Sequence, residues 1–130
     1  MPEFSKRSNL ILNTCDGKLV VLFREVVKTF DCTVVSGHRT EEEQNALLRR
    51  GLSQLSWPHS KHNHEPSLAV DVYPYPINWK DRSRCHFFAG FVMGMAESFR
   101  YKILWGGDWN RDWQVRDNVF DDLGHFELMD

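Results

Sequence analysis

Two regions of the sequence contain side chains that can bind a metal. The first holds His62, His64 and Asp71, with the aspartate inside the apolar run 68–72, and the second, near the end of the chain, holds His125. A carboxylate is costly to bury among apolar residues unless it pairs with a cation or binds a metal. Catalytic zinc takes three protein ligands and keeps a fourth position for water. One loop histidine, Asp71 and His125 therefore form a candidate zinc site, with a simple ion pair of Asp71 as the alternative.

Two more charged residues could act beside such an ion. Asp122 lies three residues before His125, where a carboxylate could take a proton from an attacking water and pass it to a leaving amine. Arg39 lies between a predicted strand and a predicted helix, and an arginine at a strand end can bind a carboxylate or stabilise a developing oxyanion. From the residues alone, an acidic surface turn and a solvated arginine are the alternatives for Asp122 and Arg39.

The apolar periodicity and the caps predict the elements that would position these side chains. The predicted helices cover residues 16–30, 40–50 and 81–99, and the predicted strands cover residues 32–36, 68–73, 102–105 and 125–128. The residues between 52 and 67 have no period, which predicts a long loop, and long ordered loops in small domains are usually functional. We predict one α+β domain over residues 1–130: a small, mostly antiparallel sheet packed with helices, with the zinc site at the sheet.

Four motifs occur in an order that a known family shares. They are Ser-Gly-His-Arg-Thr-x-x-x-Gln, Ser-Lys-His with Ala-Val-Asp, Trp-Gly-Gly-Asp-Trp, and Asp-x-x-His-Phe-Glu-Leu. Together they resemble the D-alanyl-D-alanine carboxypeptidase / L-alanyl-D-glutamate endopeptidase family of zinc peptidases, and most closely its short, single-domain phage and prophage members. The resemblance extends from Phe4 to the end of the chain.

The resemblance implies which residues hold the Zn²⁺. The common family pattern places the zinc histidine seven residues before the aspartate, and this spacing selects His64. The short phage proteins carry a loop that is two residues longer and keep the histidine beside the serine, which selects His62. We therefore expect His62, Asp71 and His125 to be the ligands, with His64 outside the ligand set.

Three further roles follow from the same resemblance. Asp122 matches the family's acid–base carboxylate, and Arg39 matches an arginine that steadies the oxyanion or anchors a substrate carboxylate. Ser60, two residues before the zinc histidine, matches a serine that contacts substrate in some relatives.

The function implied is that of a zinc peptidase of the phage lysis (endolysin) type. It would hydrolyse an amide bond in the peptidoglycan stem peptide, as an L-Ala–D-Glu endopeptidase without a separate wall-binding domain. The alternatives are a D-Ala-D-Ala carboxypeptidase and a non-catalytic zinc-binding module of a phage structure or of a wall-binding protein.

Composition and charge bear on partners and location. The net charge is −2, and from Gly106 onward seven acidic residues stand against two arginines, which argues against a nucleic-acid partner and a nuclease. The three cysteines are scattered, and the N-terminus lacks the pattern of a signal peptide. We expect a monomer without stable membrane association, made in the cytoplasm of the host bacterium and acting on the cell wall after release.

Overall fold

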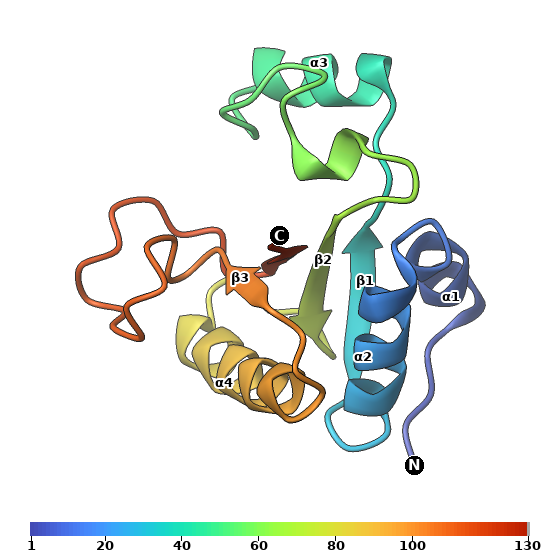
Figure 1. Ribbon diagram of the computed structural model, residues 1–130, viewed down its shortest axis with the longest axis vertical. Helices are drawn as coiled ribbons and strands as arrows, with labels where there is room; N and C mark the ends of the chain where they lie inside the picture. Colours follow the sequence, from blue (N-terminus) through green and yellow to red (C-terminus); the bar gives the residue numbers. More distant parts are fainter. Residues whose placement is uncertain (130) are drawn as a thin grey trace.

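The computed structural model describes residues 1–129, whose strands form one four-stranded sheet (Figure 1). The strands are β1 (Cys32–Ser36), β2 (Ala69–Pro74), β3 (Ile103–Trp105) and β4 (His125–Leu128). Their order across the sheet is β1-β2-β4-β3, and each neighbouring pair is antiparallel. The predicted α+β class with an antiparallel sheet is therefore confirmed.

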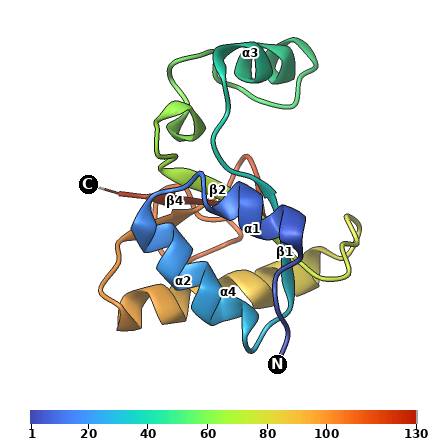
Figure 2. The ribbon, with the colours of Figure 1, turned by 90° about the vertical axis from the view of Figure 1, so that its right-hand side faces the viewer.

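The helices of the described chain lie on one face of this sheet, beside β1 and at one end of the molecule. They are α1 (Lys6–Leu12), α2 (Gly17–Val27), α3 (Glu41–Arg49), α4 (Arg82–Ser98) and the single 3-10 turn η1 (Lys61–Asn63). Helices α2 and α4 pack together beneath the sheet, and α1 lies beside β1 (Figures 1 and 2). The sequence did not predict α1, because it has only seven residues and its cap, Ser5, is the only clear start signal. None of the helices in residues 1–129 is both long and apolar enough to cross a membrane.

Strand alternation separates the core from the face that carries the polar side chains. Successive residues of a strand point to opposite faces of a sheet. Phe126 of β4 is fully buried against the helices, and its ring contacts Phe23 of α2 and Phe88 of α4 at centroid distances of 5.4 and 6.2 Å. His125 and Glu127, one residue to either side, therefore face away from that core.

Helix α4 differs in part from its predicted apolar stripe. Phe88 and Val92 are buried as expected, but Phe99 is 36% exposed because it is the C-cap, where the chain leaves the helix. Cys85 and Met93 are buried in addition.

Helix α3 and the loop after it stand at one end of the molecule, away from α2 and α4 (Figures 1 and 2). The predicted capping box is present: the Thr40 side chain accepts from the Glu43 N–H, and the Glu43 carboxylate accepts from the Thr40 N–H. Gly51, with φ of 71°, follows the end of the helix, as its position after Arg50 predicted. The long loop that follows contains η1 and otherwise has no regular structure.

Candidate metal centre

Three ligand atoms from three elements converge on one point above the sheet. Nε2 of His62 lies 3.3 Å from Oδ1 of Asp71, Nδ1 of His125 lies 3.2 Å from the same oxygen, and the two ring nitrogens are 3.3 Å apart. Tetrahedral zinc with bonds of about 2.0–2.1 Å holds its ligand atoms roughly 3.3–3.4 Å from one another. The separations in this protein therefore fit a tetrahedral ion of that size, with three ligands from the protein.

The fold positions each of these side chains. Asp71 of β2 lies directly opposite His125 of β4 in the antiparallel register, and residues in that relation share one face of a sheet. His62 lies in η1, whose N-cap Ser60 accepts a hydrogen bond from the His62 N–H at 3.2 Å. His64 follows the turn and is exposed. Of the two loop histidines, the structure brings His62 to the site and leaves His64 outside it.

The outer nitrogen of each imidazole is already engaged. Nδ1 of His62 lies 2.8 Å from the Gly37 carbonyl oxygen, and Nε2 of His125 lies 2.7 Å from Oε1 of Glu127. Carbonyl and carboxylate oxygens accept hydrogen bonds, so these two nitrogens carry hydrogens. In the neutral rings, the inner nitrogens and the Asp71 carboxylate then meet as acceptors, and either a metal ion or a proton on a ring nitrogen relieves their repulsion.

The local electrostatics favour the same conclusion. Burial alone would raise the pKa of Asp71, but His62 and His125 outweigh it and hold that pKa well below its usual range. Burial alone would lower the pKa of His125, but hydrogen bonds to Asp71 and Glu127 raise it to about 9. The site thus stabilises an ionised carboxylate and attracts positive charge to His125.

Arg39 contacts the metal-binding residues directly. Its Nη2 donates to Oδ2 of Asp71 at 2.8 Å, its Nε donates to Ser36 Oγ at 3.1 Å, and its Nη1 donates to Gln44 Oε1 at 3.4 Å. Arg39 therefore holds the Asp71 oxygen that faces away from the two histidines. The sequence predicted Arg39 as a residue of the cleft, but not this contact with Asp71.

Asp122 lies beside the three converging atoms without joining them. Its Oδ2 is 4.0 Å from Nδ1 of His125, and its side chain is 38% exposed. The turn that carries it is fixed by two backbone bonds, from the Asp122 N–H to the Gly106 oxygen and from the His125 N–H to the Asp122 oxygen. Burial, followed by the charge of Asp71, raises the pKa of Asp122. A carboxylate with a raised pKa, open to a cleft, is suited to accept and return a proton.

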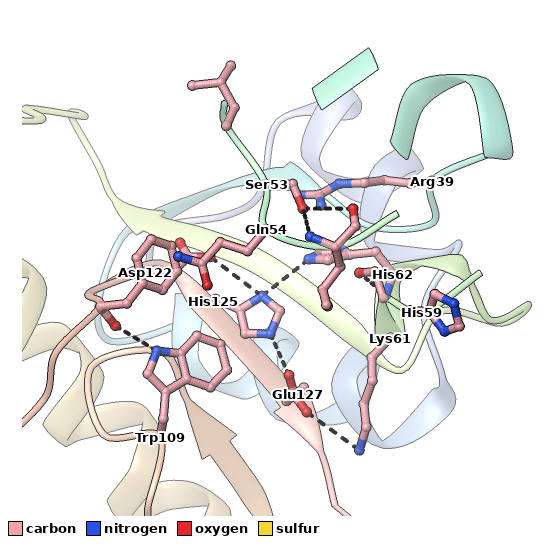
Figure 3. Close-up of a pocket in the computed structure, with 14 residues that line it drawn as sticks. Arg39, Ser53, Gln54, His59, Lys61, His62, Trp109, Asp122, His125 and Glu127 are labelled. Carbon is pink, nitrogen blue, oxygen red and sulfur yellow. Dashed lines mark hydrogen bonds and ion pairs between the residues drawn. The ribbon is translucent and has the colours of Figure 1, made fainter. Parts of the chain in front are cut away.

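A cleft of about 430 Å³ is lined by Arg39, His62, Asp122 and His125 (Figure 3). Figure 3 shows His125 in the middle, with Glu127 and Lys61 on one side and Asp122 and Trp109 on the other. Apolar side chains that the sequence did not single out also line the cleft: Leu52, Leu55, Trp109 and Phe120. Ser60 lines it too, although its buried hydroxyl also caps η1.

Glu127 and Lys61 are the charged residues that sequence reasoning missed. Both lie inside the family motifs: Glu127 comes two residues after His125, and Lys61 comes one residue after Ser60. The i, i+2 spacing in a predicted strand was the available signal, because it places Glu127 on the same face as His125.

Comparison with known proteins gives one family and one fold. A family model for the phage L-alanyl-D-glutamate peptidase matches residues 2–129. The crystal structure of the Serratia marcescens L-Ala D-Glu endopeptidase ChiX is similar with a TM-score of 0.74 and 24% sequence identity, over 98% of this chain and 90% of that chain. At this level of identity, the likeness to ChiX shows a shared fold. The search of curated proteins gives no match.

Proposed function

The chain belongs to the phage L-alanyl-D-glutamate peptidase family, and we propose that it cleaves its peptidoglycan substrate with a Zn²⁺ held by His62, Asp71 and His125. The observation that carries this proposal is the convergence of their three ligand atoms at 3.2–3.3 Å, beside an open cleft that His62 and His125 line. Two imidazoles and one carboxylate are a donor set that zinc accepts in hydrolases, with a position left for water. The family match also favours the endopeptidase over the carboxypeptidase alternative.

The ion and the protein would supply different parts of the hydrolysis. A bound Zn²⁺ would supply Lewis acidity toward the amide carbonyl and lower the pKa of water from near 16 to about 7. Asp122 accepts the proton of the attacking water and returns it to the amine of D-glutamate as the C–N bond breaks. Its position 4.0 Å from His125, together with its raised pKa, supports this assignment.

Arg39 contacts the same site through the Asp71 oxygen that faces away from the two histidines. Its bond to Oδ2 orients Asp71 with Oδ1 toward the two histidines. Arg39 also lines the cleft, which supports a second role of its positive charge, toward an oxyanion or a substrate carboxylate.

The cleft suits an extended peptide. Leu52 and Leu55 come from the loop after α3, and Trp109 and Phe120 come from the segment before β4. We propose that a stem peptide lies between these two groups, across the metal centre, in contact with Ser60. Synthesis in the host cytoplasm as a monomer, with access to the wall at lysis, is part of the same proposal and rests on the family resemblance.

Digestion of purified peptidoglycan tests the proposal. Metal-free protein, the same protein reconstituted with Zn²⁺, and a reconstituted sample with excess chelator are incubated with the wall material, and the fragments are identified by mass spectrometry. We expect new N-terminal D-glutamate, with L-alanine left on the glycan, in the zinc sample alone.

Three other results would each point to an alternative. Release of free D-alanine would identify a carboxypeptidase. Bound zinc without any cleavage would identify a non-catalytic binding module. Full cleavage by the metal-free protein would overturn the role of zinc.

A further inference from the structure

We propose that Glu127, held by Lys61, is a positioning residue that fixes the ring of His125 in the one tautomer able to bind the metal through Nδ1. This inference rests on the proposed metal site and adds to it a dependence of metal affinity on two residues that do not themselves touch the ion.

The contacts form a chain that starts at the metal centre. Nε2 of His125 donates to Oε1 of Glu127 at 2.7 Å, and Oε2 of Glu127 lies 3.5 Å from Nζ of Lys61. Lys61 Nζ also donates to the Leu128 carbonyl oxygen at 2.5 Å. The side chain of Glu127 is 14% exposed and that of Lys61 is 31% exposed. Burial of this degree reduces the screening of the pair by water.

The bond to Glu127 matters because a neutral imidazole carries a single hydrogen. With that hydrogen on Nε2, Nδ1 presents a lone pair to the ion. Without an acceptor at Nε2, the hydrogen can move to Nδ1 and bond to Oδ1 of Asp71, which is only 3.2 Å away. That bond would occupy both ligand atoms and compete with the metal.

The two histidines differ in the group that fixes the tautomer of the ring. His62 is fixed by a backbone carbonyl, that of Gly37, which no side-chain substitution removes. His125 depends on a side chain, so its tautomer can be altered by mutation. Partners of this kind around metal-binding histidines orient the ring and raise its basicity, and their loss typically weakens metal binding by about 10–100-fold.

Lys61 adds a link between two elements. It directly precedes His62 in η1, while Glu127 and Leu128 belong to β4. Its Nζ therefore ties the turn that carries one histidine to the strand that carries the other. The contact also keeps Glu127 from rotating toward the open cleft, which both residues line.

The test measures zinc affinity of the full-length protein by competition with a chromophoric chelator. We expect Glu127→Leu to bind zinc about 10–100-fold more weakly than the wild type. Glu127→Gln should retain more affinity than Glu127→Leu, because its amide oxygen can still accept from Nε2. Lys61→Met should weaken zinc binding by a smaller factor, since it leaves Glu127 in place. Glu97→Leu, which breaks the Glu97–Arg111 ion pair on the surface, is the matched control and should keep the wild-type affinity.

A second measurement separates positioning from substrate contact. At saturating zinc, the kcat of Glu127→Gln should return to near the wild-type value, because Glu127 touches neither the ion nor the reacting bond. Unchanged zinc affinity in both Glu127 variants would overturn the proposal, as would a loss of kcat that persists at saturating zinc. If Glu127→Leu does not fold, Glu127→Gln and Lys61→Met carry the same comparison.

Failure of the role of Glu127 and failure of the proposed function would give different results. A wild-type protein that binds no zinc would contradict the metal site itself. A wild-type protein that binds zinc, with Glu127 variants of equal affinity, would contradict only this inference.

Discussion

His62 and His64 are two residues apart, yet their environments are opposite. The side chain of His62 is 1% exposed and faces Asp71 and His125, whereas His64 is exposed beyond the end of η1. The turn that creates this difference is fixed by Ser60, whose side chain caps it and whose N–H donates to the side chain of Asn63. Ser60 therefore has a structural role in forming this turn, independent of any contact with the substrate.

The role of Asp122 predicts the effect of a minimal substitution. Asp122→Asn keeps the shape of the side chain and removes its ability to take a proton, so we expect a fall in kcat of about 10²–10⁴-fold. Zinc binding should stay stoichiometric, because Asp122 is not one of the three converging ligands. Peptidoglycan digestion and metal analysis on the same sample measure both quantities. Asp31→Asn makes the same chemical change at the far end of β1 and should be fully active; an Asp122→Asn protein as active as that control would exclude the acid–base role.

At the residue scale, type and spacing were enough to single out Asp71, His125 and one loop histidine, but the choice of His62 over His64 needed the resemblance to the short phage proteins. A buried aspartate, a histidine beside a serine and a late Asp-x-x-His motif are local signals. The contacts of Arg39 with Asp71 and of Lys61 with Glu127 are not local, since 32 and 66 residues separate the partners. Such pairs depend on how the loop after β1 and the turn η1 pack against the sheet, which the sequence does not state.

At the scale of the elements, the approach of β3 to the turn before β4 places Asp122. A Cβ atom added to Gly106 would lie 2.1 Å from the backbone oxygen of Asp122, so no side chain fits there without moving that backbone. We expect Gly106→Ala to displace Asp122 and lower kcat/KM on the order of 100-fold, as misplacement by about 1 Å can do.

Gly90→Ala is the matched control for that substitution. Gly90 is exposed in α4 and has no atom near the added Cβ. We expect wild-type activity and a gain in unfolding free energy of up to about 1 kcal/mol. Equal activity of the two glycine variants would show that the Gly106–Asp122 approach does not matter for catalysis.

Gln44 anchors α3 and the loop after it. Its side chain is fully buried; Nε2 donates to Ser53 Oγ at 2.9 Å and to the Leu55 oxygen at 2.7 Å, and Oε1 accepts from Arg39. Gln44→Ala removes these three hydrogen bonds from a fully buried position, so we expect a loss of about 1–3 kcal/mol in unfolding free energy. Urea unfolding measures it, with Gln54→Ala, at an exposed position, as the control expected within about 0.5 kcal/mol of the wild type. A loss of the same size in both variants would mean that Gln44 does not anchor the loop.

The element boundaries that the sequence predicted correctly are those with strong local signals. The capping box at Thr40, Gly51 after α3 and Asp81 before α4 all mark helix ends in the structure. The prediction failed for α1, whose seven residues have little periodicity. The strand order β1-β2-β4-β3 was also beyond the sequence, because β4 enters between two strands that precede it in the chain.

At the scale of the whole molecule, the candidate ion joins three separate parts of the chain. Its ligands come from η1, β2 and β4, and in the unfolded chain these are far apart. An ion that binds only the folded state stabilises it by about 2.7 kcal/mol when free zinc is 100 times the dissociation constant. We expect this gain in urea unfolding of the wild type and of His64→Ala, and its loss in His62→Ala. Equal stabilisation of His62→Ala would place the zinc elsewhere on the protein.

The proposed function depends on the identity and the position of the ion. Crystals grown with Zn²⁺ and measured on both sides of the zinc absorption edge locate it by anomalous scattering. The predicted result is one strong peak about 2.0–2.1 Å from Nε2 of His62, Oδ1 of Asp71 and Nδ1 of His125. A peak bound by other residues, or no peak among these three side chains, would contradict a zinc site at His62, Asp71 and His125.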